Sequence, residues 1–220
     1  MKDPRKIAIY GAGGFGREVA WLLSTAERMK TLEVVGFIED DAARGRVVNG
    51  KPVLSWESFV ASHRDALVTL AVGDPASRRG VAEKCGKAGF SFATVVHHSV
   101  EISEFVELGV GSIVCSGSIL TVNIEIGPHV HINLDCTIGH DVRIGEFTTL
   151  SPGVHVSGNV HIGKQVYIGT GATIINGTSK NPLVIADGTV IGAGACVTRS
   201  TDGNSLYAGV PAELKKRYGK

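Results

Sequence analysis

The 220-residue sequence has few of the features that mark secreted, membrane-spanning or nucleic-acid-binding proteins. Its cysteines are few and widely spaced, with no C-x-x-C pair: Cys85, Cys115, Cys136 and Cys196. We expect them to be reduced thiols, mostly buried. No apolar run approaches the ~20 residues of a membrane span, and no hydrophobic leader of signal-peptide type is recognisable. The sequence therefore predicts a cytoplasmic protein.

The sequence also has no marked excess of positive or negative charge. The 22 basic residues are balanced by 21 acidic ones, which leaves a net charge of +1. Nucleic-acid-binding proteins usually carry a marked basic excess, so that class is not favoured. Proline is scarce, with 7 residues, but glycine is abundant, with 29. A hydrophobic content of 43% argues against intrinsic disorder and allows a sizeable core.

An aliphatic residue occupies every sixth position through the second half of the chain. The unbroken series is Val96, Ile102, Leu108, Val114, Leu120, Ile126, Ile132, Ile138, Ile144, Leu150, Val156, Ile162, Ile168 and Ile174. Glycine often follows the aliphatic residue. The register then breaks once, because eleven residues rather than six separate Ile174 from Ile185. The extra residues centre on 177–182, where we expect a loop to protrude.

A period of six excludes an α-helix, whose period is 3.6. It is typical of a parallel β-helix, in which each hexapeptide supplies a short strand and a corner. Three hexapeptides close one triangular coil, so residues eighteen apart should stack at the ~4.8 Å spacing of neighbouring strands. The aliphatic residues then point inward and form the core.

The first part of the chain has a different pattern, in which strands and helices alternate. We expect strands at 6–10, 33–38 and 66–72, and helices at 17–28 and 75–87. This alternation predicts a parallel sheet that binds ligands beyond the carboxyl ends of its strands. The sequence thus predicts an α/β half-Rossmann domain over residues 1–95. An all-β parallel β-helix with a C-terminal tail follows over residues 96–220.

Gly11, Gly13 and Gly16 form a G-x-G-x-x-G turn between the first strand and the first helix. An acidic cluster begins at Glu39, 23 residues after Gly16. Such a turn lets backbone amides approach a phosphate group. A dinucleotide fold needs two mononucleotide-binding halves, and only one fits before Val96. We therefore favour a nucleotide sugar or a similar phosphate-bearing ligand over a nicotinamide dinucleotide. A tight turn without a ligand is the alternative.

The order of these motifs resembles a known family. The motifs are the glycine turn, Gly73-Asp74, the hexapeptides, the pair within Ile138-Gly139-His140-Asp141, and Gly209-Val210-Pro211-Ala212. Together they resemble the hexapeptide-repeat sugar acyltransferases of the NeuD/PglD type, over nearly the whole chain. Within that group the chain looks most like the N-acetyltransferases of nucleotide-linked 4-amino-sugars, of the 4-amino-4,6-dideoxy type, in surface glycan biosynthesis. The resemblance implies a left-handed β-helix, a homotrimer and acetyl-CoA as co-substrate, with no metal.

The resemblance also implies roles for three residues in the coils. His140 would be the catalytic base, Asp141 its partner and Asn133 a positioning group. Histidine suits this role because its unperturbed pKa of ~6.5 allows it to take up the proton that an amine loses when it attacks a thioester. Successive residues of a strand point to opposite faces, so Asp141 can reach His140 only at a corner. The adjoining Gly139 favours a corner there.

Ligand contacts are implied in the same way. The acyl-CoA positions are Thr149, Thr170 and Ala193. The sugar-nucleotide positions are Gly13, Gly14, Phe15, Glu39, Asp40 and Gly73. Two features depart from the resembled enzymes: a related enzyme has histidine at the position of Thr149, and the loop at 177–182 could lengthen or reshape the CoA groove.

Other functions stay open at this point. An O-acetyltransferase of sugars or sialic acid would use the same fold, and a β-helical scaffold would need no catalytic residue. A β-helix protein like the zinc-dependent carbonic anhydrases would need two histidines five residues apart, and no successive histidines in the coils have that spacing. We expect the remaining coil histidines to be surface residues at corners: His129, His131, His155 and His161.

Overall fold

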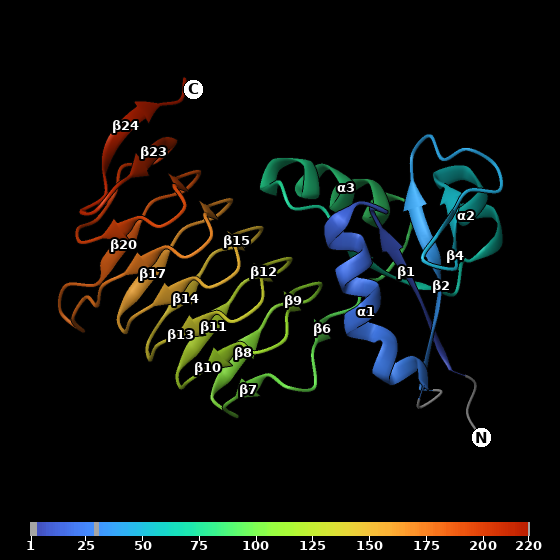
Figure 1. Cartoon of the computed structure of the whole chain (residues 1–220), viewed down its shortest axis with the longest axis horizontal. Coiled ribbons are helices and arrows are strands. Elements are labelled where there is room, and N and C mark those ends of the chain that lie inside the picture. The colour runs from blue at the N-terminus through green and yellow to red at the C-terminus, as the bar shows by residue number, and fades with distance from the viewer. Residues whose placement is uncertain (1–3, 29–30, 220) are drawn as a thin grey trace. The chain divides into compact units, whose positions relative to one another are not determined.

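The computed structural model describes residues 4–28 and 31–219. The chain divides into two compact units (Figure 1). The first comprises the described residues up to 73 together with 77–95, and the second comprises 74–76 and the residues from 96 onward. Each unit is described by itself.

The first unit is built on a five-stranded sheet with the order β3-β4-β2-β1-β5. Its strands are β1 (Arg5–Tyr10), β2 (Leu32–Glu39), β3 (Val47–Val48), β4 (Lys51–Ser55) and β5 (Leu67–Leu70). Its helices are α1 (Gly14–Arg28), α2 (Trp56–Ser62) and α3 (Pro75–Lys87). Strands β2, β1 and β5 run parallel, as predicted. Strand β4 also pairs parallel with β2, and β3 pairs antiparallel with β4. The hairpin of β3 and β4 and helix α2 were not predicted.

The sequence of β1 explains its central place. Four consecutive residues, from Ile7 to Tyr10, are buried, as expected for a parallel strand covered on both faces. Helix α1 begins at Gly14, three residues before the expected start at Arg17, so the helix starts inside the glycine turn.

The second unit is a parallel β-helix with three faces. The first face contains β6 (Val95–Val96), β9 (Ile113–Val114), β12 (His131–Ile132), β15 (Thr149–Leu150), β18 (Tyr167–Ile168), β21 (Val190–Ile191), β23 (Ser205–Ala208) and β24 (Glu213–Arg217). The second contains β7 (Glu101–Ile102), β10 (Ile119–Leu120), β13 (Thr137–Ile138), β16 (His155–Val156), β19 (Thr173–Ile174) and β22 (Cys196–Val197). The third contains β8 (Val106–Leu108), β11 (Ile124–Ile126), β14 (Arg143–Ile144), β17 (Val160–Ile162) and β20 (Leu183–Ile185).

The strand register confirms the predicted period. Leu120 pairs with Ile138, and Ile138 pairs with Val156, so stacked residues are eighteen apart. Across the inserted segment the separation grows to 23, since Ile162 pairs with Ile185. Nearly all of the hexapeptide aliphatic residues are buried in one continuous core. The exceptions lie at the start of the coils, where Ile102 stays exposed.

Short polar residues with left-handed backbone conformations make one of the three corners. Asn123, Asp141 and Asn159 lie eighteen residues apart between the second and third faces, with φ angles of 55°, 58° and 55°. Asparagine and aspartate enter this region of backbone space more readily than other residues with a side chain. This corner, called here the Asp141 corner, carries the His140–Asp141 pair.

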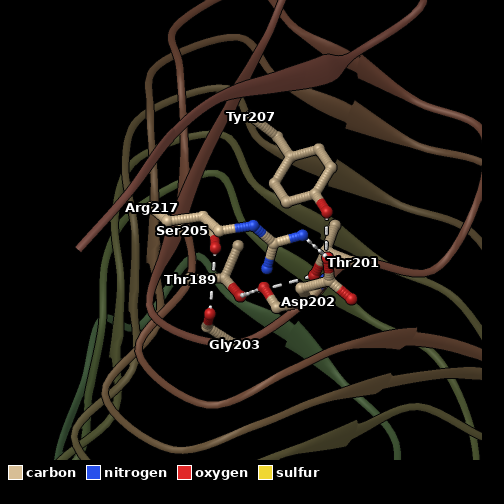
Figure 2. Close-up of polar contacts among 7 residues, drawn as sticks. All are labelled: Thr189, Thr201, Asp202, Gly203, Ser205, Tyr207 and Arg217. Atoms are coloured by element: carbon tan, nitrogen blue, oxygen red, sulfur yellow. Dashed lines mark hydrogen bonds and ion pairs between the residues drawn. The ribbon is translucent and has the colours of Figure 1, made fainter. Parts of the chain in front are cut away.

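A polar cluster closes the C-terminal end of the β-helix (Figure 2). Thr189 donates its hydroxyl to the carbonyl of Ala186 at 2.6 Å, and the amide of Asp202 donates to the hydroxyl of Tyr207 at 3.1 Å. Arg217 of the antiparallel strand β24 pairs with the carboxylate of Asp202 at 2.6 Å. These bonds satisfy polar groups where the stack of parallel strands ends.

Candidate active site

His140 and Asp141 lie at the corner that follows β13. Nδ1 of His140 is 2.7 Å from Oδ2 of Asp141, and both side chains are about half exposed, at 58% and 48%. The positive φ of Asp141 turns the chain between the two residues, which meets the geometric condition for the pair. The imidazole therefore lies on the outside of the β-helix and not among the aliphatic residues of its core.

Two hydrogen bonds hold the carboxylate of Asp141. The bond to His140 and then the bond from Nδ2 of Asn123 to Oδ1, at 3.2 Å, keep the pKa of Asp141 below its usual value. A carboxylate beside Nδ1 requires the proton of a neutral imidazole to be on Nδ1, which leaves Nε2 as the basic nitrogen. The arrangement can accept a proton from a substrate at Nε2.

A polar groove of about 420 Å³ lies beside Asp141. Its lining residues are Asn123, Glu125, Asp141, Arg143, Asn159, His161, Ser179 and Pro182. Within it, Arg143 pairs with Glu125 at 3.2 Å. The inserted loop forms one wall of this groove through Ser179 and Pro182. The amide of Gly177 at the start of the loop donates to the carbonyl of Gly158, one coil above His140. The insertion thus belongs to the Asp141 corner.

Asn133 lies at another corner. It follows β12, whereas His140 follows β13, so the two residues stand at opposite ends of β13. Nδ2 of Asn133 donates to the carbonyl of Leu150 in the next coil at 2.7 Å. One chain alone does not bring Asn133 beside the His140–Asp141 pair.

Two of the predicted acyl-CoA residues, Thr170 and Ala193, lie at the same corner as Asn133 but two and three coils further along the β-helix. Thr170 and Ala193 are exposed and stack at the corner between the first and second faces, where the amide of Gly194 donates to the carbonyl of Thr170 at 2.8 Å. Thr149 lies on β15, the strand that leads into this corner, and its side chain is buried. We call Asn133, Thr149, Thr170 and Ala193 the Asn133 group.

The predicted sugar-nucleotide residues come together at one edge of the parallel sheet. Gly13, Gly14 and Phe15 follow β1, Glu39 and Asp40 lie at the end of β2, and Gly73 follows β5. Residues beyond the carboxyl ends of adjacent parallel strands share an edge, where ligands of this fold class bind.

The glycines of the turn serve different purposes. A Cβ on Gly16 would overlap with the carbonyl oxygen of Gly11, so the close approach of α1 to β1 requires glycine there. A Cβ on Gly13 would meet no atom within 4 Å. Packing within the chain does not explain Gly13, and the space beside it is open.

Both predicted acidic residues are ion-paired. Asp40 accepts hydrogen bonds from Lys84, at 2.5 Å, and from the hydroxyl of Tyr10, and these bonds lower its pKa. The ammonium group of Lys84 also lies 4.6 Å from the centroid of the Trp56 ring. Glu39 pairs with Arg46. Asp40 is therefore part of an ordered polar cluster and not an isolated solvated acid.

The expectation that the other coil histidines are surface residues at corners is wrong for all four, because each is either buried or on a strand. His129 is at a corner but buried, stacked on Phe147 with ring centroids 5.0 Å apart. His131 lies on β12 and is fully buried. His155 and His161 lie on strands, and Nδ1 of His155 is 2.8 Å from the hydroxyl of Thr137.

The described residues contain no group of three or more histidine, cysteine or acidic side chains placed to hold a metal ion. Over residues 4–28 and 31–219, no helix is long and apolar enough to span a membrane. The four cysteines are free thiols, and three of them are buried, as predicted.

Asn123 was not expected at the site. Its signal in the sequence was its distance of eighteen residues from Asp141, which places it directly beneath that residue in the preceding coil.

Comparisons with known proteins support the same fold and chemistry. Residues 6–85 match the PglD N-terminal domain, and residues 141–176 match the bacterial transferase hexapeptide (six repeats). The chain is 32% identical over 211 residues to the GDP-perosamine N-acetyltransferase of Escherichia coli O157:H7, which covers 95% of this chain and 96% of the relative.

Two solved structures are similar over nearly their whole length. WeeI from Acinetobacter baumannii AYE is 37% identical with a TM-score of 0.90, covering 96% of this chain and 100% of WeeI. The acetyltransferase domain of PglB from Neisseria gonorrhoeae FA1090, in complex with acetyl coenzyme A, is 30% identical with a TM-score of 0.86, covering 96% and 100%.

Proposed function

The chain belongs to the nucleotide-amino-sugar N-acetyltransferases that join a PglD-type N-terminal domain to a left-handed hexapeptide-repeat β-helix, and from that membership we propose its acceptor, its catalytic residues and its assembly. The protein is an acetyl-CoA-dependent enzyme that acetylates the amine of a nucleotide-linked amino sugar. The acceptor we propose is a nucleotide-linked 4-amino-4,6-dideoxy sugar used in surface glycan biosynthesis. GDP-perosamine, in the name of the 32%-identical relative, is the first compound to test.

His140 is the general base of this reaction, and the hydrogen bond between Nδ1 and Asp141 is the observation that carries the assignment. The amine nitrogen attacks the thioester carbonyl carbon, and a C–N bond forms. Nε2 of His140 takes the proton that the nitrogen loses, directly or through one water. The C–S bond then breaks, and the CoA thiolate takes this proton back from Nε2 of the His140 imidazolium, directly or through one water, so that CoA leaves as a thiol and His140 is again neutral. The charged Asp141 carboxylate stabilises the imidazolium in between.

The sugar nucleotide binds at the carboxyl edge of the parallel sheet. The open space beside Gly13 and the start of α1 at Gly14 suit a diphosphate, which backbone amides at a helix N-terminus favour. Phe15, Asp40 and Gly73 contact the nucleoside from the neighbouring strand ends, with Glu39 beside them. A cytoplasmic location belongs to this proposal, and its support is that the four cysteines are free thiols, as is usual in a reducing compartment.

The active site is shared between subunits of a homotrimer. The support is that His140 and the Asn133 group occupy different corners of one chain. A neighbouring subunit would bring its Asn133, Thr170 and Ala193 to the His140 corner, with Thr149 beside the pantetheine arm of acetyl-CoA. Asn133 then orients the acceptor sugar or the imidazole of His140.

The acceptor is tested by mixing the protein with acetyl-CoA, a thiol-trapping reagent and a panel of GDP-, UDP- and dTDP-linked 4-amino sugars. We expect CoA release together with an N-acetylated product for at least one of them. Release with the matched hydroxyl sugars alone would indicate O-acetylation instead.

The assembly is tested by complementation between His140→Ala and Asn133→Ala subunits. Each variant alone should be nearly inactive, but co-refolded mixtures should regain about a quarter of wild-type activity, because random mixing pairs an intact His140 with an intact Asn133 at that fraction of interfaces. Mixtures as inactive as the separate variants would place both residues in one subunit's site or outside it.

A further inference from the structure

The His140–Asp141 pair touches the coil before it and the coil after it. We infer that Asn123, in the preceding coil, and Gly158, in the following coil, are positioning residues that fix the orientation of this pair. The inference rests on the proposed function, in which His140 is the base.

Asn123 fixes the carboxylate. Its Nδ2 donates to Oδ1 of Asp141, while Oδ2 faces the imidazole, so the two oxygens have different partners. The torsion that rotates a carboxylate is soft, and Asp141 is half exposed, so water would otherwise compete for both oxygens. The amide of Asn123 keeps Oδ2 directed at Nδ1. The amide of Asp141 also donates to the carbonyl of Val122 at 3.2 Å, which keeps the two coils in register here.

The backbone alone does not demand asparagine at position 123. Aspartate adopts the same left-handed conformation elsewhere in the β-helix, at Asp135 with φ 56° and at Asp141 with φ 58°. What aspartate lacks is the N–H donor. The side-chain amide of Asn123 is therefore explained by its bond to Asp141.

Gly158 leaves the space that the imidazole fills. A Cβ on Gly158 would overlap with Nε2 of His140, and its three nearest atoms would all belong to that ring. The φ of Gly158 lies outside the left-handed region, so its backbone does not require glycine. A side chain there would push the ring away from Asp141 or cover Nε2.

Substitutions of Asn123 separate positioning from a purely structural role. Asn123→Asp keeps the size and the backbone preference but sets a second carboxylate against Oδ1. We expect kcat to fall by about 10- to 100-fold with the KM for acetyl-CoA unchanged, since small misplacements of a catalytic group have effects of that order. The acid limb of the pH profile should move to higher pH, because an added negative charge favours the protonated imidazole. Asn123→Gly should lower kcat by less.

Asn204 provides the matched control. It has the same residue type and a similar φ of 48°, but it lies at a different corner near the C-terminal end. Asn204→Asp and Asn204→Gly should keep the wild-type kcat and pH profile.

Gly158→Ala tests the other side of the ring. The ring is the flexible partner, so the backbone should keep its course and the thermal midpoint should stay within a few degrees of wild type. We expect kcat to fall about tenfold or more and the ring ¹⁵N signals of His140 to shift. Ser157→Ala, a change at the exposed neighbouring residue, should leave both kcat and the ring ¹⁵N signals of His140 unchanged.

The outcomes distinguish this inference from the proposed function. If the wild type acetylates the amino sugar and His140→Ala does not, but Asn123→Asp and Gly158→Ala keep the wild-type kcat and pH profile, the inference is wrong and the proposed base stands. If His140→Ala itself keeps wild-type activity, the proposed base is wrong.

Discussion

Nδ1 of His140 lies 2.7 Å from Oδ2 of Asp141 even though the two residues are neighbours in the chain. In an extended strand, neighbouring side chains point to opposite faces. The φ of 58° at Asp141 turns the backbone at the corner, and both side chains then project from the same edge of the β-helix. The corner thus creates the pair.

Replacing Asp141 by asparagine should reduce the rate without disturbing the fold. Asparagine occupies the same corner at positions 123 and 159, so the backbone will accept it. The charge that stabilises the imidazolium is lost, and we expect kcat to fall about tenfold, less than on loss of the base itself. Steady-state kinetics with saturating acetyl-CoA measures this effect, and an unchanged kcat would remove Asp141 from the mechanism.

Two glycines of the turn should respond differently to alanine. Gly16→Ala places a Cβ against the carbonyl of Gly11, and we expect a loss of about 2 kcal/mol or more in the stability of the N-terminal unit. Gly13→Ala meets open space, so the thermal midpoint should stay constant while the KM for the sugar nucleotide rises. Equal effects of the two variants on stability would contradict these different roles.

Asp40→Asn should weaken binding of the sugar nucleotide and leave acetyl-CoA unaffected. The variant removes the charge that pairs with Lys84, at the sheet edge assigned to the nucleotide. We expect the KM for the sugar nucleotide to rise several-fold, with the KM for acetyl-CoA unchanged. Asp65→Asn, which disrupts the exposed pair with Lys6, is the control, and a similar rise there would show that the effect is not specific to the site.

Cys136 should make the β-helix sensitive to alkaline pH. Burial raises the pKa of its thiol to about 11. Because the folded state holds this proton more tightly than the unfolded state, the stabilisation is complete below the unfolded pKa of about 8.5 and is lost as the pH rises through the folded value. The contribution to be lost is about 3 kcal/mol, because each pKa unit between the folded and unfolded states corresponds to about 1.4 kcal/mol.

The pH-dependent contribution of the Cys136 thiol to stability can be measured as the difference in unfolding free energy between wild type and Cys136→Ala. It should be largest near neutral pH and shrink as the pH rises from about 9 towards 11, as measured by denaturant unfolding. A difference that is constant with pH would mean that the thiol does not titrate in this way.

The β-helix was predictable because each inward position accepts only an aliphatic side chain, so Ile138 and its equivalents reveal the period and the register. The hairpin of β3 and β4 was not, since Val47 and Val48 form too short a run to show alternation. The burial of His131 was also missed, because the hexapeptide pattern identifies the inward residues but not what covers an outward one.

The candidate site was predictable only in part. His140 and Asp141 have a recognisable sequence context, whereas the contact of Asn123 with Asp141 depends on stacking between coils. The period of six also does not tell which corners of the β-helix contribute residues to one active site. Asn133 lies at a different corner from His140. That separation became visible only in three dimensions.

Acetyl transfer by His140→Ala tests the central claim most directly. The measurement is CoA release and N-acetylated product from acetyl-CoA and the preferred nucleotide-linked amino sugar, with wild type and variant compared at equal concentration and confirmed folding. Removal of the base predicts a kcat lower by a factor of order 10²–10⁴, with the KM values nearly unchanged. A folded variant that turns over at close to the wild-type rate would contradict the claim that this imidazole takes the proton of the amine.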